Sequence, residues 1–333
     1  MRSATASARE KARQAVADAT RWQTPELAFW AVAIAAIFLF PSRHLLLNEI
    51  AIVGLFALSI DLILGYAGIV SLGHAAFFGV GAYTAGLLAK AGIGEPVAGL
   101  AIAAAVAAAV GFATSFLVIR GSDLTRLMVT LSVALVFVEI ANRFESITGG
   151  VDGLLGISMG PILGLFEFDF GGTTAYCYSL AVLFGMFLVA RRLVRSPFGT
   201  SLRALKENRL RAGAIGIPTA RRIVTIYTIS ASIAGVAGAL LAQTTAFVSL
   251  EVLDFARSAD GLLILVIGGS GYLYGGLLGA IAFALMRDAL SSLTPAYWMF
   301  WMGAILVALV VVGRERVVAK FAAAVDRLRG SGS

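Results

Sequence analysis

From residue 26 onward the chain alternates long apolar runs with short polar connections. Most runs approach 20 residues, about the length that an α-helix needs to cross the roughly 30 Å hydrocarbon core of a bilayer. Such runs are expected to be helical, because lipid offers no partner to free backbone groups. The pattern therefore predicts an all-α integral membrane protein with about ten segments, at 26–40, 45–65, 69–90, 97–119, 123–142, 173–190, 223–247, 259–269, 275–290 and 296–313.

The composition excludes a soluble domain. Of the 333 residues, 59% are hydrophobic and 14% are charged, whereas a soluble domain carries about 25% charged residues. The first 25 residues are polar and mildly basic, and a cleaved signal peptide would place its apolar core much nearer the start. We expect a cytoplasmic N-terminal tail at 1–25, a transmembrane domain at 26–313 and a cytoplasmic C-terminal tail at 314–333.

The distribution of lysine and arginine predicts the orientation, because these residues concentrate in cytoplasmic loops. The densest group lies in the loop 191–222, where Glu207 is the only acid. With this loop in the cytoplasm, the N-terminal tail lies on the same side. The C-terminal tail lies there too only if 259–290 crosses the membrane twice, as two short segments hinged at its glycines. The loop 143–172 then lies outside, and its acids outnumber its single basic residue, Arg143. We therefore expect about ten crossings and two cytoplasmic termini.

Two segments are rich in glycine: GYAGIVSLGHAAFFGVGAYTAG at 65–86 and IGGSGYLYGGLLGAIAFALM at 267–286. Glycine lets helices approach closely, and Gly275 and Gly279 have the spacing of helix contacts. Plain packing is therefore one interpretation. The other is a pair of broken helices that line a transport pathway near the membrane midplane. On that interpretation, the pathway candidates in and beside these segments are Asp61, Tyr66, Gly68, His74, Gly268, Gly269 and Gly271.

Several polar side chains are predicted at membrane depth, where an ionisable group costs several kcal/mol unless it is paired or hydrated. For that reason all of them are pathway candidates: Glu49, Asp61, His74, Glu139, Asn142 and Gln243. Structural roles are the alternative, since Glu49, Glu139 and Asn142 fall near predicted span ends. Asp61 and His74 flank the first glycine-rich turn, and they could bind each other or backbone groups that the glycines set free.

A charged segment interrupts the apolar pattern at 195–218 and reads RSPFGTSLRALKENRLRAGAIGIP. As one helix over 198–215 it would place small and apolar residues, among them Ala204 and Ala212, on one side. The other side would carry charged residues: Arg203, Lys206, Glu207 and Arg211. Two interpretations remain open. The helix lies on the membrane surface among lipid phosphates, or its small-residue side docks into a groove of a cytoplasmic partner.

This segment resembles the cytoplasmic signature of LivM-like proteins, the branched-chain amino acid permease family of ABC importers. Three further stretches are similar to that family. They are the glycine-rich signature at 65–86, the external-loop sequence TGGVDGLLGI at 148–157, and the late glycine-rich segment VIGGSGYLYGGLLGA at 266–280. All four follow the family's order along the chain. The sequence departs from the family's usual cytoplasmic signature at Lys206, Leu210 and 211–213. These differences affect which ATPase the segment would bind, not whether it binds one.

The resemblance implies a coupling helix within 198–218, through which a separate ATPase drives the permease. The residues that it assigns to ATPase coupling are Ser201, Leu202, Arg203, Ala204, Leu205, Lys206, Glu207, Asn208, Arg211, Ala212, Gly213, Ile215 and Gly216. The sequence itself contains no GxxxxGK[ST] loop to hold ATP phosphates. The implied partners are two ATPase subunits, a second related permease chain and a periplasmic substrate-binding protein, and the implied location is a bacterial inner membrane.

The function that follows is translocation of branched-chain or related hydrophobic amino acids, with no catalytic residue or cofactor in this chain. Relatives of the family also carry urea, short amides or aromatic acids. The single cysteine, Cys177, and two histidines give no sign of a metal site. The pI of 9.8 follows from the basic residues that orient the chain in a membrane, so nucleic acid is not expected as a partner. Membrane lipid is the expected partner.

Two other classes of protein are alternative interpretations of the sequence. An ion-coupled secondary carrier acting alone would fit the broken helices and the buried Asp61 and Glu139, but it leaves the basic loop unexplained. A membrane scaffold without transport has no positive feature in the sequence.

Overall fold

The computed structural model describes Trp22 and residues 24–119 and 123–312. The predicted C-terminal tail and most of the predicted N-terminal tail lie outside these residues. The described residues form helices and loops with two isolated β-bridges, so the all-α prediction is confirmed. The long helices cover the predicted segments: α2 (Thr24–Leu39), α3 (His44–Asp61), α4 (His74–Lys90), α5 (Pro96–Ile119), α6 (Asp123–Arg143), α8 (Thr173–Arg195), α11 (Thr219–Thr245), α12 (Phe255–Gly268), α13 (Leu273–Leu293) and α14 (Trp298–Val312).

Shorter helical elements occupy several of the connections. They are η1 (Pro41–Arg43), the π-helical turn η2 (Leu62–Tyr66), α7 (Glu145–Thr148), η3 (Gly150–Asp152), α9 (Pro197–Glu207), α10 (Arg209–Ala214) and η4 (Leu250–Leu253). The turn η2 directly continues α3, and α12 and α13 are separated by a short glycine-containing turn. Both predicted helix breaks are therefore present.

Among the described residues, six helical segments are long and apolar enough to cross a membrane: Pro41–Tyr66, Pro96–Ile119, Leu124–Arg143, Thr173–Arg195, Thr219–Thr245 and Leu273–Leu293. The helices α2, α4, α12 and α14 are apolar but shorter, with 14 to 17 residues. At about 1.5 Å per residue, the longest of these four extends roughly 25 Å, which is less than a typical hydrocarbon core. The number of ten crossings therefore stays a prediction.

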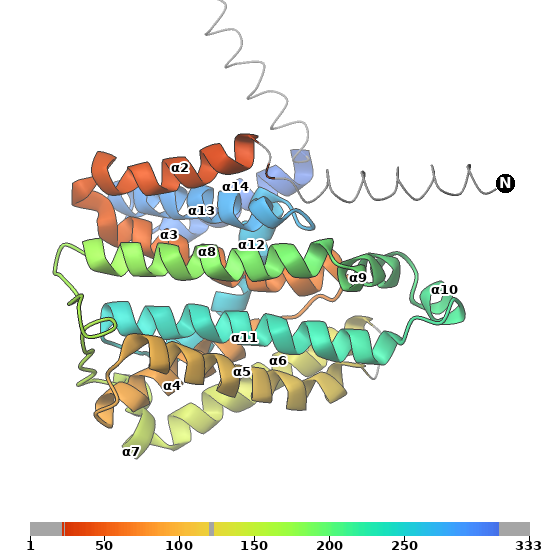
Figure 1. The fold of residues 1–333 in the computed structure, drawn as a ribbon, viewed down its shortest axis with the longest axis horizontal. Helices are drawn as coiled ribbons and strands as arrows, with labels where there is room; N and C mark the ends of the chain where they lie inside the picture. Colours follow the sequence, from red (N-terminus) through yellow and green to blue (C-terminus); the bar gives the residue numbers. More distant parts are fainter. Residues whose placement is uncertain (1–21, 23, 120–122, 313–333) are drawn as a thin grey trace, which may run out of the picture.

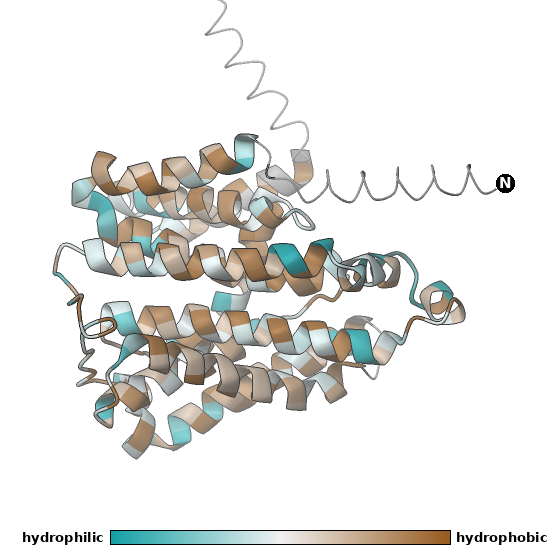
Figure 2. Ribbon diagram, in the orientation of Figure 1, coloured by the Kyte–Doolittle hydropathy of each residue, from teal (hydrophilic) through white to brown (hydrophobic). Residues whose placement is uncertain are grey.

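The long helices run roughly along one axis, so that the connections gather at two ends (Figure 1). Helices α9 and α10 project from one end, here called the α10 end. The other, the α7 end, holds the loop between α7 and α8, where the bridge Leu154–Val248 and a 2.9 Å hydrogen bond from Gly160 N to Gly94 O join separate connections. Figure 2 shows that the middle parts of the helices are mainly hydrophobic and that hydrophilic residues lie toward both ends. This distribution is expected for a bundle whose middle is surrounded by a bilayer.

The core lies where α11 packs along α4 and α5, and where α3 packs between α8, α11 and α13. Small residues make the first contact possible, because a Cβ atom at Gly81 would overlap the carbonyl group of Gly235. On the other side of the bundle, Gly279 touches the backbone of Ile264 and Gly268 in α12. Many glycines of both rich segments thus allow close helix packing, as one of the two interpretations predicted.

At the α7 end, Asp169 caps the start of α8. Its carboxylate oxygens accept hydrogen bonds from the backbone N–H groups of Thr173 (3.1 Å) and Thr174 (2.7 Å). Desolvation by burial is the largest single effect and opposes ionisation, but the hydrogen bonds together outweigh it and lower the pKa of Asp169 to about 2. An ionised carboxylate also suits a helix N-terminus, so the long loop before α8 is fixed to the bundle at that point.

Candidate functional site

The charged segment forms two helices rather than the single helix predicted over 198–215. Ser196 caps α9 by accepting a hydrogen bond from Gly199 N, and Pro197 occupies the first turn. The helix ends at Asn208, whose backbone is extended (φ −160°, ψ 108°). Its side chain accepts the N–H of Arg211 at 2.9 Å and so caps α10. Asparagine breaks the helix because its side chain offers backbone donors an alternative partner.

The side of this segment that was predicted to dock on a partner instead packs against the chain's own helices. Ser201, Leu202, Leu205 and Ala212 are buried and Ala204 is half-buried. The neighbouring elements are α8, η2 and α11. Ala212 is therefore not available to a partner and Ala204 only in part, which corrects the interpretation that their side of the segment is the docking surface.

The exposed side carries both charged and apolar residues. Of the residues assigned to coupling, those exposed are Arg203, Lys206, Glu207, Asn208, Arg211, Gly213, Ile215 and Gly216. Leu210 and Ile215 are 89% and 72% exposed. The apolar surface that a partner could contact is thus on and just after α10, projecting from the bundle (Figure 1).

Lys206 joins α9 to the first helix break. Its ammonium group donates a 2.8 Å hydrogen bond to the carbonyl oxygen of Gly65 in η2. The aliphatic stem of the lysine lies over Gly68, which has a positive φ of 67°. The π-helical turn at η2 departs from the regular α-helical hydrogen-bond pattern, as such turns often do at functional sites. One turn earlier on α9, the Arg203 guanidinium lies 5.5 Å from the Tyr66 ring centroid.

The same turn contacts the second glycine-rich segment. Asp61 is fully buried, and its Oδ1 accepts a 2.7 Å hydrogen bond from the backbone N–H of Gly271. A Cβ atom at Gly65 would overlap both the Gly271 backbone and the Asp61 carboxylate. Oδ2 of Asp61 has no hydrogen-bond partner among the described residues, while the Lys206 charge interacts with this carboxylate at longer range. We call the group Asp61, Gly65, Lys206 and Gly271 the junction.

His74 does not belong to the junction. Its Nε2 lies 3.0 Å from the hydroxyl of Ser230 on α11, and that hydroxyl also contacts the carbonyl oxygen of Ser59. The suggestion that Asp61 and His74 bind each other is therefore wrong. The suggestion that they bind backbone groups near the glycines holds for Asp61, which accepts from Gly271 N–H, but not for His74, whose partner is the Ser230 side chain. Asp61 thus connects α3 to the second glycine-rich segment, and His74 connects α4 to α11.

The remaining polar candidates have separate surroundings. Gln243 is buried, accepts a 3.0 Å hydrogen bond from the Tyr178 hydroxyl and donates to Pro96 O at 2.7 Å, which is a packing role. Glu139 is exposed and Asn142 half-buried on α6. Glu49 forms an ion pair with Arg287. None of these contacts the junction.

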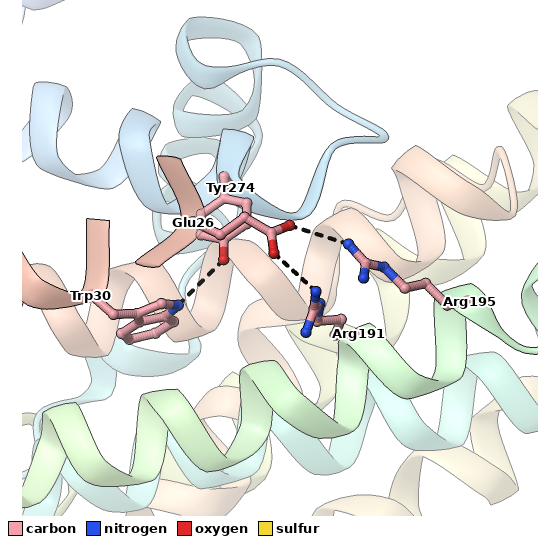
Figure 3. Close-up of polar contacts among 5 residues, drawn as sticks. All are labelled: Glu26, Trp30, Arg191, Arg195 and Tyr274. Atoms are coloured by element: carbon pink, nitrogen blue, oxygen red, sulfur yellow. Dashed lines mark hydrogen bonds and ion pairs between the residues drawn. The ribbon is translucent and has the colours of Figure 1, made fainter. Parts of the chain in front are cut away.

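Sequence reasoning missed a buried ion-pair network at the start of α2 (Figure 3). Glu26 binds Arg191 (2.9 Å) and Arg195 (3.1 Å), both in the last turns of α8. The Trp30 indole N–H lies 3.3 Å from the Tyr274 hydroxyl and links α2 to α13. Arg191 and Arg195 were counted only as orienting charges. The available signal was an isolated acid, Glu26, on the predicted cytoplasmic side of the first apolar run.

Glu26→Ala should loosen α2 from the bundle, because it removes the carboxylate that neutralises a buried arginine. Breaking one side of a buried ion pair costs about 3–5 kcal/mol. The melting temperature of the purified protein in detergent measures this loss. Glu207→Ala, at an exposed acid on α9, is the matched control and should melt like the parent chain. Equal melting temperatures for both variants would contradict a stabilising role of the network.

A bundle of apolar helices that is broken at glycines and carries a basic helix pair at one end fits a membrane transport permease. The chain belongs to the family described as "Branched-chain amino acid transport system / permease component", whose sequence model matches residues 43–310. This membership and the apolar helices together make it a multi-pass membrane protein.

Individual relatives agree with this family. The chain is 31% identical over 281 residues to the "High-affinity branched-chain amino acid transport system permease protein LivM" of Escherichia coli, covering 76% of this chain and 64% of that protein. LivM of Salmonella typhimurium matches with the same identity and coverage. A "Probable branched-chain amino acid transport permease protein LivM" of Methanocaldococcus jannaschii is 26% identical over 271 residues, or 69% of this chain and 76% of that one. The match thus spans somewhat under two thirds of the two bacterial relatives. No solved structure matches the chain.

Proposed function

We propose that this chain is the permease subunit of an ATP-driven importer that moves branched-chain or related hydrophobic amino acids into the cell. The observation that carries the proposal is the junction. There Lys206 of an exposed helix contacts Gly65, and Gly65 contacts Gly271 of the second helix break. Movement of α9 by an attached motor would therefore reach both broken helices through direct contacts. In this proposal ATP hydrolysis takes place in partner subunits, which agrees with the lack of a GxxxxGK[ST] loop in the sequence.

The proposed cycle needs no covalent chemistry in this chain. Two ATPase subunits close on ATP and displace α9 and α10, which lie on the cytoplasmic side together with both termini of the chain. Lys206 and Arg203 carry the displacement to η2, and Asp61 carries it to the turn between α12 and α13. Since the helices are closely packed, they shift as bodies between two arrangements. Selectivity rests largely with a periplasmic binding protein that docks at the α7 end, over residues 143–172.

A second permease chain completes the translocation unit in this proposal, and the membrane is a bacterial inner membrane. Positive charge supports the orientation. The α10 end holds Arg191, Arg195 and the charged side chains of α9 and α10, whereas the loop at the α7 end carries Glu145, Asp152, Glu167 and Asp169.

Leu210→Glu should abolish binding of the ATPase subunits without harming the fold, because this side chain is 89% exposed. An exposed leucine on a projecting helix contributes little to the fold, but a charge there would face the apolar groove of a partner. Co-purification of the ATPases with the tagged permease measures the effect. Leu155→Glu replaces an equally apolar residue, 61% exposed, at the α7 end, and it should retain the ATPases. Retention by the Leu210 variant would contradict docking at α10.

The alternative function is an ion-coupled secondary carrier that works alone, and buried Asp61 is the feature that favours it. Reconstitution separates the two functions. The importer predicts uptake only in vesicles that also contain the ATPases, the second permease, ATP and the loaded binding protein. Sustained accumulation of leucine by this chain alone, driven by a proton or sodium gradient, would overturn the proposal.

A further inference from the structure

A second group of charged residues lies inside the α7 end, away from the junction. Glu49 is on α3, Arg257 and Asp260 are on α12, and Arg287 is on α13, and all four are half-buried. Glu49 follows His44 by five residues, or about 7 Å along the helix, and His44 contacts Thr173 at the α7 end. Ionisable groups at such depth are costly and mark ligand or ion pathways by default.

Only part of this group is paired directly. Arg287 and Glu49 form an ion pair between α13 and α3. Arg257 lies over the ring of Phe78, with 5.5 Å between the guanidinium carbon and the ring centroid. Within the described part of the chain, neither Arg257 nor Asp260 has a hydrogen bond or close ion pair with another side chain, although their charges interact at longer range. Arg257 and Asp260 thus lie on successive turns of α12 without a direct ion pair between them.

Both residues line one small cavity between α3, α4, α12 and α13. Arg257, Asp260 and Arg287 form its polar wall. The rest of its lining is apolar and consists of Val53, Phe56, Phe78, Gly261, Ile264 and Phe283. The cavity is partly enclosed and has a volume of about 10 Å³, which is room for roughly one water molecule. The cavity must widen to admit an amino acid, and the Glu49–Arg287 pair connects two of the helices that surround it.

We propose that Arg257 and Asp260 bind the carboxylate and the ammonium group of an α-amino acid during its passage, while the apolar wall receives its side chain. A guanidinium binds a carboxylate through two parallel hydrogen bonds, and an aspartate accepts from an ammonium group. The three-residue spacing separates the two side chains by about 4.5 Å along the helix, which is comparable to the size of the zwitterionic head group. The inference rests on the proposed function and assigns to it the residues that would hold the two charged groups of the substrate, which urea and amides lack.

Two measurements test the site. The first is the melting temperature of the purified permease complex, without binding protein, in millimolar leucine. Leucine should raise it, because a ligand stabilises the state that it binds. Leucinol, which lacks the carboxylate, and 4-methylpentanoate, which lacks the ammonium group, should not. Arg257→Gln and Asp260→Asn should each lose the leucine shift.

The second measurement is leucine uptake by the whole importer in proteoliposomes. Each variant should lower uptake about tenfold or more, the effect of losing a hydrogen bond to a charged group, while ATP hydrolysis stimulated by the binding protein continues. Arg43→Gln is the matched control. Arg43 pairs with Asp288 at the same end (3.0 Å) but does not line this cavity, so uptake should persist.

The outcomes separate this inference from the proposed function. Absence of a leucine shift in the parent complex, or variants that lose uptake but keep the shift, would overturn the site while leaving the importer intact. Failure of the parent importer to accumulate leucine with ATP and binding protein would overturn the proposed function itself.

Discussion

Replacing Gly65 with alanine is expected to abolish transport and to destabilise the protein. The added methyl group would overlap the backbone of Gly271 and the carboxylate of Asp61. Neither group can move away cheaply, because Asp61 is fully buried and hydrogen-bonded to Gly271. Overpacking of this kind costs about 1–3 kcal/mol, and it would also hold the two helix breaks apart. Uptake by the reconstituted importer and the melting temperature in detergent measure the two effects.

Gly185→Ala provides the control for this variant. Gly185 lies within α8, and a Cβ atom there would meet nothing within 4 Å. Alanine is the better helix former by about 1 kcal/mol, so this variant should be as stable as the parent or more so and should transport normally. If Gly65→Ala also transported normally and kept the stability of the parent, the close approach of the two glycine-rich segments would not be required for transport.

The helices could be predicted from the sequence because a membrane imposes one simple requirement on each of them. Every segment must satisfy its backbone internally and expose apolar side chains, so apolar runs alone located the long helices α2–α6, α8 and α11–α14 within a few residues. The two glycine-rich breaks were visible for the same reason, since Gly65 and Gly271 interrupt otherwise apolar runs. Helix positions and helix breaks both depend on residues that are neighbours in the sequence, so the sequence alone could predict them.

The junction could not be predicted, because it depends on contacts between residues that are far apart in the sequence. Asp61 and Gly271 are 210 residues apart, and Lys206 and Gly65 are 141 apart. The sequence placed Lys206 among coupling residues and Asp61 among pathway candidates. Only the packing of α9 against η2 shows that these two sets meet. The break at Asn208 was missed for another reason, since an asparagine cap competes closely with a continuing helix.

Force from α9 would reach the helix breaks through the side chain of Lys206. Lys206→Met keeps an unbranched apolar stem that can lie over Gly68 but removes the donor to the Gly65 carbonyl oxygen. We expect ATPase binding and ATP hydrolysis to persist, while leucine transported per ATP hydrolysed falls about tenfold, as for loss of one charge-assisted hydrogen bond. Simultaneous measurement of uptake and phosphate release in proteoliposomes gives this ratio.

Arg192→Met is the matched control, because Arg192 is an exposed basic residue in the last turn of α8. It loses the same charge at the same end of the bundle without touching the junction, so its ratio should equal that of the parent. If the Lys206 variant also kept the parent ratio, α9 would not act through Gly65, and a helix resting on the membrane surface would become the better account of this segment. If the variant instead lost the ATPases, Lys206 would belong to the docking surface rather than to the path of force. The ratio and the co-purification together therefore assign Lys206 to one role.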